Sequence, residues 1–226
     1  MKKMTFYTLS ALVLALFASP AAAGKADKEV ATLRGDTLVI QNDHMQRTFL
    51  WNDGDLVSLS AMRGANTFRF VNPGGVPDLS CNGAPLALGD GTFTVTKVDG
   101  NAMIPPHHRV TVTASNDSMV IRRVFRVYPE APALACDYYI RLNGKPDLQQ
   151  SGHSTPWHFS EHLYFSPIHW QLEVTLFRDR TDIYNNLVET TAVVPYLHEM
   201  QLKGNIVSAT HPLSDRGFFL LKESPS

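Results

Sequence analysis

The chain has 226 residues, 44% of them hydrophobic, and a formal net charge of −1 at pH 7. The charge is close to neutral, and no basic run or basic helix face is present that could neutralise a phosphate backbone. We therefore expect no nucleic-acid partner. The length suits one large domain that buries about 70% of its unfolded surface on folding.

The first 23 residues have the three zones of a secretory signal peptide. Lys2 and Lys3 precede an apolar run over residues 9–17, and small residues follow up to Ala23. The run is too short for a membrane-spanning helix, which needs about 20 residues. We predict cleavage after Ala23, a soluble domain over residues 24–226 that is periplasmic or secreted, and no membrane partner. Loss of two lysines leaves 18 basic against 21 acidic residues, a net charge of −3.

Short runs of alternating apolar and polar residues predict β-strands in the rest of the chain. Every second residue is apolar in 109–115, and after an Asn-Asp-Ser turn a similar run covers 119–127. The run at 134–142 repeats the pattern, which indicates a long antiparallel hairpin followed by a third strand. Further strands are expected at 37–41, 47–51, 56–62, 92–98, 170–178, 188–194, 206–210 and 218–222.

These runs amount to roughly eleven or more strands with no helical periodicity between them, so the predicted class is all-β. A system of this size favours two packed antiparallel sheets, a large supersandwich, over βαβ units, whose crossovers need about a dozen residues. The stretches 71–91 and 145–166 are rich in Gly, Pro and Asn. We expect irregular loops there.

The two cysteines, Cys81 and Cys136, would reach an oxidising compartment after export, where a disulfide can persist. Cys136 falls on the apolar face of a predicted strand, whereas Cys81 lies in a turn-like LSCNG segment. The spacing leaves a disulfide open but favours two free thiols. Neither cysteine has the CxxC spacing of a metal or redox site, and we expect no metal and no cofactor.

Three segments of the sequence resemble those of a known protein family. They are DTLVIQNDHMQRTFLWNDGDLVSLSAM at 36–62, FRDRTDIYNNLVE at 177–189 and the closing RGFFLLKESPS. Together they resemble the N-terminal supersandwich domain of secreted bacterial α-galactosidase-like enzymes of glycoside hydrolase clan D, family 36 type, whose fold is similar to that of galactose mutarotases. The resemblance covers most of the mature chain in strand order and a few short motifs.

In such enzymes the domain is followed by a (β/α)₈ barrel in which two aspartates act as nucleophile and acid/base. No position of this sequence matches those motifs, and a barrel needs at least about 200 residues of alternating strands and helices. The resemblance implies a non-catalytic domain, inactive alone, that packs on a barrel absent from this chain and shapes its substrate entrance. We expect a fragment of a longer glycosidase, with that barrel and a galactoside-like carbohydrate as partners.

The segment SGHSTPWHFSEHLYFSPIHW, residues 151–170, concentrates His, Trp and Tyr. A pyranose stacks its apolar face on an aromatic ring, while its hydroxyl groups need polar partners. The candidate carbohydrate-binding residues are therefore Trp157, His158, His153 and Trp170, with the first two favoured. The alternative is that these side chains pack the loop onto a sheet or onto the neighbouring barrel.

Two other functions remain open. The domain could be a stand-alone carbohydrate-binding module. Alternatively, EHLYFSP at 161–167 resembles the NHxYFNL segment of aldose 1-epimerases, which implies His162 as general acid and Glu173 or Glu199 as base. Glu replaces the first Asn of that motif and Ser-Pro replaces its Asn-Leu, so the segment departs from the epimerase pattern.

Carboxylates in predicted turns could in principle hold calcium. Asp53, Asp55, Asp179 and Asp182 lack the ligand spacing of an EF-hand loop, and we interpret them as solvated turn residues. The RDRTD segment at 178–182 is expected to be a hairpin turn held by Arg-to-carboxylate pairs, or a surface that docks on the barrel.

Overall fold

The structure is a computed structural model that describes residues 29–72, 74–143, 157–164, 170–177, 188–193, 205–214 and 216–221. Within these ranges the chain forms sixteen β-strands and one three-residue 3₁₀ helix, η1 (Asn52–Gly54). The predicted all-β class with packed antiparallel sheets is confirmed. The signal segment, His153, Glu199 and the RDRTD turn lie outside the described residues. No helix in the described ranges is long and apolar enough to cross a membrane.

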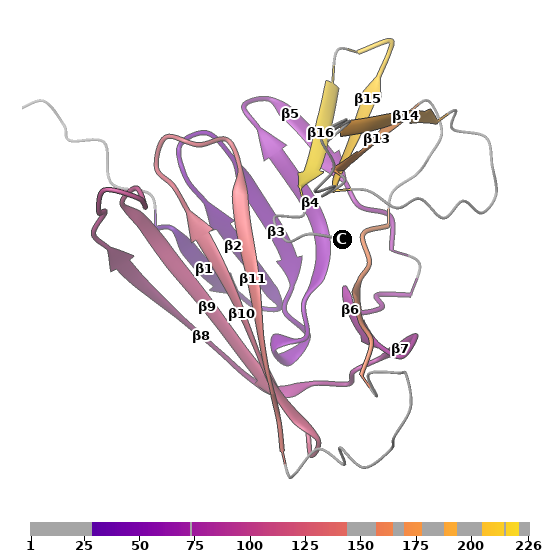
Figure 1. The fold of residues 1–226 in the computed structure, drawn as a ribbon. Helices are drawn as coiled ribbons and strands as arrows, with labels where there is room; N and C mark the ends of the chain where they lie inside the picture. Colours follow the sequence, from indigo (N-terminus) through magenta and orange to yellow (C-terminus); the bar gives the residue numbers. More distant parts are fainter. Residues whose placement is uncertain are drawn as a thin grey trace, which may run out of the picture.

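The first five strands form an antiparallel meander, sheet A (Figure 1). They are β1 (Ala31–Arg34), β2 (Thr37–Gln41), β3 (Gln46–Leu50), β4 (Val57–Arg63) and β5 (Asn66–Arg69). Tight turns allow this order. Gly35 adopts a φ of +59° between β1 and β2, which favours glycine. The Asn42 side chain accepts hydrogen bonds from the backbone N–H groups of His44 and Met45, both at 2.8 Å, before β3 begins.

Four longer strands form sheet C, which faces sheet A. They are β8 (Gly89–Val98), β9 (His107–Ser115), β10 (Met119–Val127) and β11 (Leu134–Leu142), in the spatial order β11-β10-β9-β8. The β9–β10 turn is closed by Asn116, whose side chain accepts hydrogen bonds from the N–H groups of Ser118 and Met119, both at 3.0 Å. Val120 pairs with Ser115. The hairpin predicted from alternation is therefore confirmed.

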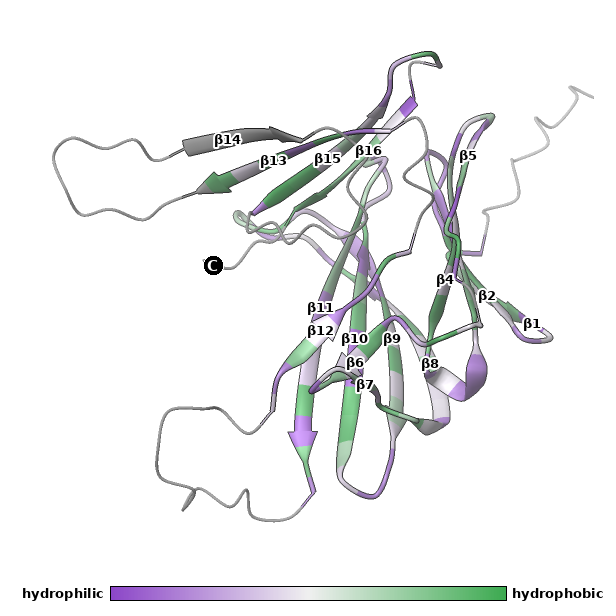
Figure 2. Ribbon diagram, turned by 90° about the vertical axis from the view of Figure 1, so that its right-hand side faces the viewer, coloured by the Kyte–Doolittle hydropathy of each residue, from purple (hydrophilic) through white to green (hydrophobic). Residues whose placement is uncertain are grey.

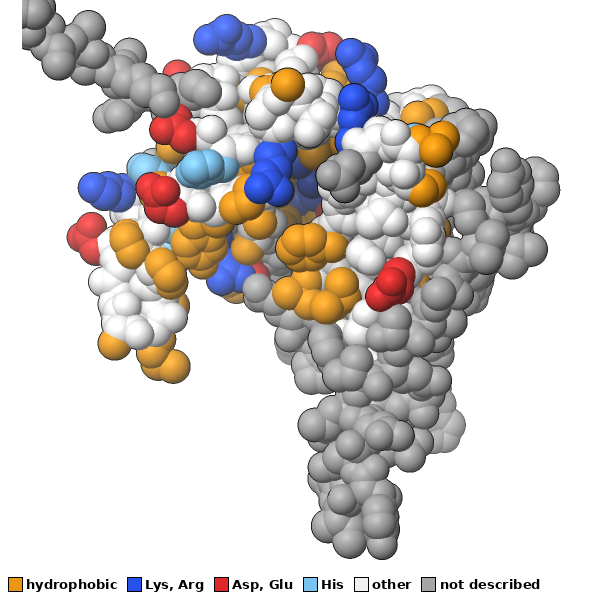
Figure 3. Space-filling model, turned by 90° about the horizontal axis from the view of Figure 1, so that it is seen from above, with side chains coloured by type: hydrophobic (Ala, Val, Ile, Leu, Met, Phe, Trp, Pro, Cys, Tyr) orange, Lys and Arg blue, Asp and Glu red, His pale blue; other side chains and the backbone are white. Residues whose placement is uncertain are grey.

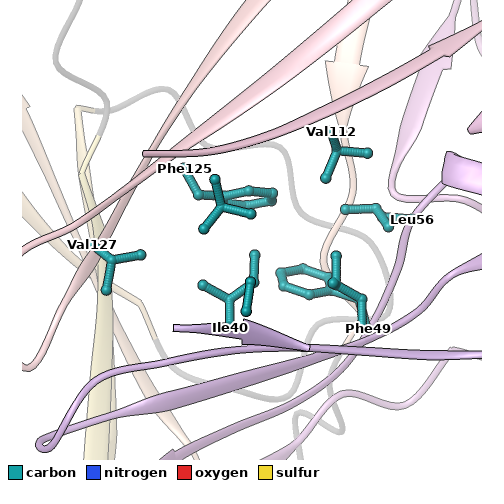
Figure 4. Close-up of a cluster of buried hydrophobic side chains, with 9 residues drawn as sticks. Ile40, Phe49, Leu56, Val112, Phe125 and Val127 are labelled. Carbon is teal, nitrogen blue, oxygen red and sulfur yellow. The ribbon is translucent and has the colours of Figure 1, made fainter. Parts of the chain in front are cut away.

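Sheets A and C pack face to face over an apolar core (Figure 4). The rings of Phe49 and Phe125 meet across this interface with their centroids 5.4 Å apart. Full burial of such a side chain contributes about 1.5–3 kcal/mol. All core members have an exposed fraction of 3% or less: Ala31, Leu38, Ile40, Phe49, Leu56, Val110, Val112, Phe125 and Val127.

A small third sheet, sheet B, covers another part of the inner face of sheet C. It contains β6 (Leu79–Cys81), β7 (Ala84–Pro85) and β12 (Phe159–Glu161), in the order β12-β6-β7. Asn82 and Gly83 connect β6 to β7 with φ of 51° and 79°, as a type I′ hairpin requires. The buried side chains that join sheet B to β10 are Leu79, Cys81, Leu86, Met119 and Ile121.

The expectation of irregular loops at 71–91 and 145–166 is wrong in part. The first stretch contains β6, β7 and the start of β8, and the second contains β12. These strands are only two or three residues long apart from β8, which is too short to show alternation. Ser80 and Ser160, which pair in sheet B, are also 80 residues apart in the chain. Local pattern does not reveal such a pairing.

The fourth sheet, sheet D, stands at the top of Figures 1 and 2. It contains β13 (Gln171–Phe177), β14 (Val188–Val193), β15 (Ile206–His211) and β16 (Arg216–Leu221), in the order β14-β13-β15-β16. Aromatic packing joins it to sheet A, since the ring of Phe68 in β5 lies 4.5 Å from that of Phe218 in β16 between centroids. Figure 2 shows hydrophobic segments along β13 and β15, where Val174 and Ala209 are buried.

Both cysteines are free thiols, the alternative that the sequence favoured. Cys81 is buried in β6, and Cys136 is half-buried in β11. Cys81 packs in the cluster between sheet B and β10, whereas Cys136 packs against the core between sheets A and C.

Candidate functional site

Residues 157–164, termed the strap, carry the two favoured carbohydrate-binding candidates. Trp157 has an exposed fraction of 37%, and His158 is also exposed. The backbone at His158 is held by the β6–β7 turn. Its N–H donates to Oδ1 of Asn82 at 2.9 Å, and the N–H of Asn82 donates to the carbonyl oxygen of His158 at 2.8 Å. Both candidate side chains are thus presented to solvent from a hydrogen-bonded backbone.

Hydrogen bonds continue along the rest of the strap. Its central part is β12, which pairs with β6. Beyond β12, the N–H of His162 donates to the carbonyl oxygen of Asp78 at 2.6 Å. The N–H of Val71 donates to the carbonyl oxygen of Tyr164 at 2.7 Å. The strap is therefore attached to the sandwich near both of its ends and in its middle.

Trp170, another of the predicted residues, lies at the start of sheet D and not in the strap. Its ring packs edge to face with those of Phe68, His211 and Phe218, at 5.3, 5.5 and 5.8 Å between centroids. The residue is half-buried. These contacts place Trp170 at the junction of sheets A and D, which agrees with the packing alternative for this residue. His153 lies outside the described residues.

A charged cluster, made of Arg47, Asp78, Arg123 and Glu161, lies next to the strap. Arg123 of β10 is its centre, with a side chain that is only 8% exposed. Its Nη2 lies 2.6 Å from Oε1 of Glu161, and its Nη1 lies 3.5 Å from Oδ2 of Asp78. The Asp78 side chain is 1% exposed, whereas that of Glu161 is 36% exposed. One arginine therefore joins a buried carboxylate to a carboxylate of the strap.

Sheet A supplies the remaining partners of Asp78. Its Oδ1 accepts a hydrogen bond from the N–H of Ser58 at 2.8 Å, and its Oδ2 accepts one from the hydroxyl group of Ser58 at 2.7 Å. Arg47 of β3 donates from Nη2 to the same hydroxyl oxygen at 2.9 Å. A buried carboxylate needs partners of this kind to offset its loss of hydration. The cluster thus links β3, β4, β10 and the strap.

Burial and neighbouring charges set the ionisation of these groups. Burial alone would lower the pKa of Arg123, but its neighbours, first Tyr138 and then Glu161, outweigh this and raise it well above the ordinary value. Burial, followed by repulsion from Arg123, lowers the pKa of Arg47. Burial also raises the pKa of Cys136 and, more strongly, that of Tyr138. Arg123 is therefore a permanent positive charge, and the thiol and phenol beside it remain neutral.

The neutral thiol argues against a cysteine nucleophile at this position. Nε of Arg123 donates to Sγ of Cys136 at 3.4 Å, but burial outweighs this contact and keeps the proton on sulfur. Reactive cysteines need a lowered pKa and access to solvent. We interpret Cys136 as a structural neighbour of Arg123.

Ser80 and His162 form a second polar pair beside the cluster. Their Oγ and Nε2 atoms are 2.8 Å apart, which is within reach for a serine activated by a histidine base. Ser80 is only 5% exposed, however, and its Oγ also lies 3.5 Å from the carbonyl oxygen of Ser160. We interpret the pair as an attachment of the strap and not as a catalytic dyad, because a substrate could not approach the hydroxyl group.

A cavity of about 20 Å³ adjoins Arg123, with Asp55, Tyr138 and apolar side chains in its lining. A water molecule needs roughly 10–15 Å³, so the cavity has room for about one water and none for a sugar ring. The interpretation of Asp55 as a solvated turn residue is wrong, because it is 2% exposed. Burial raises the pKa of its carboxyl group, and its Oδ2 accepts a hydrogen bond from the N–H of Leu88 at 3.2 Å.

The neighbouring turn residue, Asp53, is exposed but is also held by protein groups. Its carboxylate accepts hydrogen bonds from the N–H groups of Asp90 and Gly91 at 3.1 and 3.3 Å. The backbone of η1 packs closely against that of β8. A Cβ atom on Gly54 would lie only 2.7 Å from Cα of Gly91, so only glycine fits there. Two glycines therefore allow the turn at 52–55 to lie against sheet C and to bury Asp55.

Among the described residues, the groups that the epimerase alternative requires lie beside different sheets. His162 lies in the strap beside sheet B, and Glu173 is an exposed residue of β13 in sheet D. Glu199 is outside the described residues. Nor does any group of three or more His, Cys, Asp and Glu side chains in the described part of the chain have an arrangement that could hold a metal ion.

The charged cluster was not singled out from the sequence, although β10 contains a signal for it. Arg123 follows the same alternation as the apolar inward-facing residues of this strand, and an arginine in that position requires a buried partner. The partners are not predictable from spacing, since Asp78 and Glu161 lie 45 and 38 residues away. The inward-facing residues of β10 are Met119, Ile121, Arg123, Phe125 and Val127.

Comparison with known proteins does not assign this chain to a family. The chain matches no known protein family, and no curated protein matches it.

Proposed function

We propose that this chain is a non-catalytic β-sandwich domain that contacts carbohydrate through the strap. The observation that carries the proposal is the placement of Trp157, which is 37% exposed beside an exposed histidine, on a segment hydrogen-bonded to the sandwich. An indole face suits the apolar face of a sugar ring, and an imidazole suits its hydroxyl groups. By contrast, the buried Arg123 next to the strap is already paired with Asp78 and Glu161.

More specifically, we propose the N-terminal domain of a secreted or periplasmic α-galactosidase-like glycoside hydrolase. The segments at 36–62, 177–189 and 216–226 support this assignment by their resemblance to that family, and an all-β sandwich is compatible with it. In this role the domain packs on a (β/α)₈ barrel and shapes its substrate entrance. The carbohydrate is then a galactoside, and the reacting carboxylates belong to the barrel.

Exposed apolar side chains on sheet D support a packing role. Leu213, Phe219 and Leu221 of the β15–β16 hairpin have exposed fractions of 84%, 63% and 51%. Seen from above, where sheet D lies, the molecule carries several groups of apolar side chains on its surface (Figure 3). Phe219 and Leu221 alternate along β16 and so share one of its faces, and an exposed apolar face is what a surface covered by another protein presents. We propose that the barrel covers this hairpin.

Titration calorimetry tests the carbohydrate contact. Galactose and melibiose are titrated into the wild type, Trp157→Ala and, as a control, Tyr139→Ala, whose exposed ring lies on β11. We expect millimolar binding to the wild type and to the control. Loss of the stacked ring should weaken binding about tenfold or more, since stacking of this kind is worth roughly 0.5–1.5 kcal/mol and area burial adds to it. Absence of heat from the wild type would remove the carbohydrate contact from the proposal.

A stand-alone carbohydrate-binding module is the second candidate. It is favoured by Tyr164, which is 37% exposed and lies in the same strap as Trp157, because two exposed rings could bind a sugar without a barrel. Binding much tighter than millimolar by the isolated chain would favour the module. Hydrolysis of an aryl α-galactoside by the purified protein at enzyme-like rates would overturn both candidates, because each assumes that the chain is not catalytic.

A further inference from the structure

The strap is attached to the sandwich by two kinds of contact. Backbone hydrogen bonds join it to the short strand β6 and to residues on either side of that strand. In addition, side-chain contacts attach the strap: Nε2 of His162 lies 2.8 Å from Oγ of Ser80, and Oε1 of Glu161 lies 2.6 Å from Nη2 of Arg123. A small sheet of this kind has little stability alone. The charge-assisted contact of Glu161 is stronger than a neutral hydrogen bond of similar geometry, so it adds to the attachment that the other bonds provide.

Arg123 is the fixed half of this ion pair. Its guanidinium carbon lies 5.0, 5.2 and 5.5 Å from the ring centroids of Phe125, Tyr138 and Phe49, and Asp78 approaches its Nη1. A guanidinium group surrounded by rings and a buried carboxylate cannot follow a moving segment. The interior of the sandwich therefore fixes where the Glu161 carboxylate lies, and this contact adds to the backbone hydrogen bonds that hold the strap.

From this geometry we infer that Glu161 and Arg123 are positioning residues for the carbohydrate contact. Their ion pair sets the place of the strap on the sandwich and, through the strap, the place of Trp157 and His158, which precede Glu161 by a few residues. The inference rests on the proposed function for its ligand. Its structural part does not, since loss of the Glu161 carboxylate should loosen the strap whether or not a sugar binds.

Hydrogen exchange measured by mass spectrometry tests the structural part. The variants are Glu161→Ala and a matched control, Glu173→Ala, which removes an exposed glutamate of β13. In the first variant, amides of residues 157–164 should exchange about tenfold faster or more, the effect of losing one charged hydrogen bond. Amides of β9 and β10 should be unchanged in both variants. Exchange in the strap of Glu161→Ala at the wild-type rate would overturn the inference.

Galactose titration of the same variants tests the positioning role. Glu161→Ala should weaken binding about tenfold, and Glu161→Asp should restore part of the affinity because it keeps the carboxylate with a shorter reach. A residue that acted only on global stability would lower the melting temperature and leave the affinity of the folded protein unchanged, which would overturn the positioning role. If Glu161→Ala does not fold, Glu161→Gln, which keeps the side-chain volume, replaces it in both measurements.

The two proposals fail in different ways. Faster exchange in the strap without any galactose binding to the wild type contradicts the carbohydrate contact, and with it the ligand of the positioning role. Galactose binding to the wild type with equal affinity and equal strap exchange in Glu161→Ala contradicts the positioning role alone.

Discussion

Two neighbouring regions on the inner face of β10 are stabilised differently, one by apolar packing and the other by charge pairing. Around Phe125 and Val127 the interior is apolar and packs against sheet A. One step along the same face, Arg123 joins two carboxylates and lies beside three aromatic rings. Apolar cores tolerate substitutions that conserve volume, whereas a buried charge depends on each of its partners. One strand therefore contains a region specified by shape and a region specified by charge.

Replacement of Arg123 by Met should have one of the two largest effects, because it removes the guanidinium group that pairs with buried Asp78 and with Glu161. We expect a loss of about 3–5 kcal/mol in the free energy of unfolding, the usual result of breaking a buried pair from one side. Urea denaturation provides the measurement. The matched control is Arg122→Met, an exposed arginine on the opposite face of the same strand, for which we expect about 0.5 kcal/mol or less. A loss under about 1 kcal/mol in Arg123→Met would contradict the distinction between the two regions.

Substitutions at Phe125 sharpen the comparison from the apolar side. Phe125→Ala should cost about 3–5 kcal/mol, because it removes a ring that is 1% exposed and leaves a cavity. Phe125→Leu keeps most of the volume and should cost less than about 1.5 kcal/mol. The same denaturation experiment measures both. Equal losses in the two variants would show that this region, too, is specified by more than volume.

The pH dependence of stability tests Asp55, which lines the cavity next to Arg123. Burial raises the pKa of this carboxyl group in the folded state, so its contribution to stability is present below the ordinary pKa of an aspartate, near 4. The contribution is lost as the pH rises through the raised pKa. The stability of the wild type relative to Asp55→Asn should therefore fall as the pH rises from about 4. Asp117→Asn, in an exposed turn, serves as the control, and a rise over that range would refute the assignment.

The smallest effect is expected at the ion pair between Arg126 and Asp137. Nε of Arg126 lies 3.0 Å from Oδ2 of Asp137, and the two side chains are 24% and 35% exposed. Pairs at this exposure contribute about 0.2–1 kcal/mol. Asp137→Asn should lose no more than that, and less at high salt. A loss comparable to that of Arg123→Met would mean that exposure does not separate the two kinds of ion pair in this protein.

The sequence was sufficient where elements are long and their partners are close in the chain. Alternation over 109–127 predicted the β9–β10 hairpin and the inward direction of Phe125, and both are confirmed. It was insufficient for β6, β7 and β12, which are two or three residues long. It also missed β1 and β5, which are four residues each. Short strands are determined by what they pack against, and periodicity carries little information about that.

The candidate site also contains features that the sequence predicted and features that it missed. Composition of the 151–170 segment drew attention to Trp157 and Trp170 together, but they lie beside different sheets and one is packed among three rings. Asp55 was expected in solvent because it follows a turn, yet close packing of two glycines buries it. The inward-facing position of Arg123 could have been recognised from the alternation along β10. Its partners depend on contacts across several strands, which the sequence pattern does not contain.

The separation in the chain between the strap and its partners bears on the order of assembly. Asn82 and His158 are 76 residues apart, and Ser80 and His162 are 82 residues apart, whereas the β9–β10 hairpin closes over a three-residue turn. Distant contacts form late, because the entropy of closing a long loop is lost before they can compensate for it. We therefore expect the β9–β10 hairpin to form early in refolding and the strap, with its proposed carbohydrate contact, to join the sandwich later.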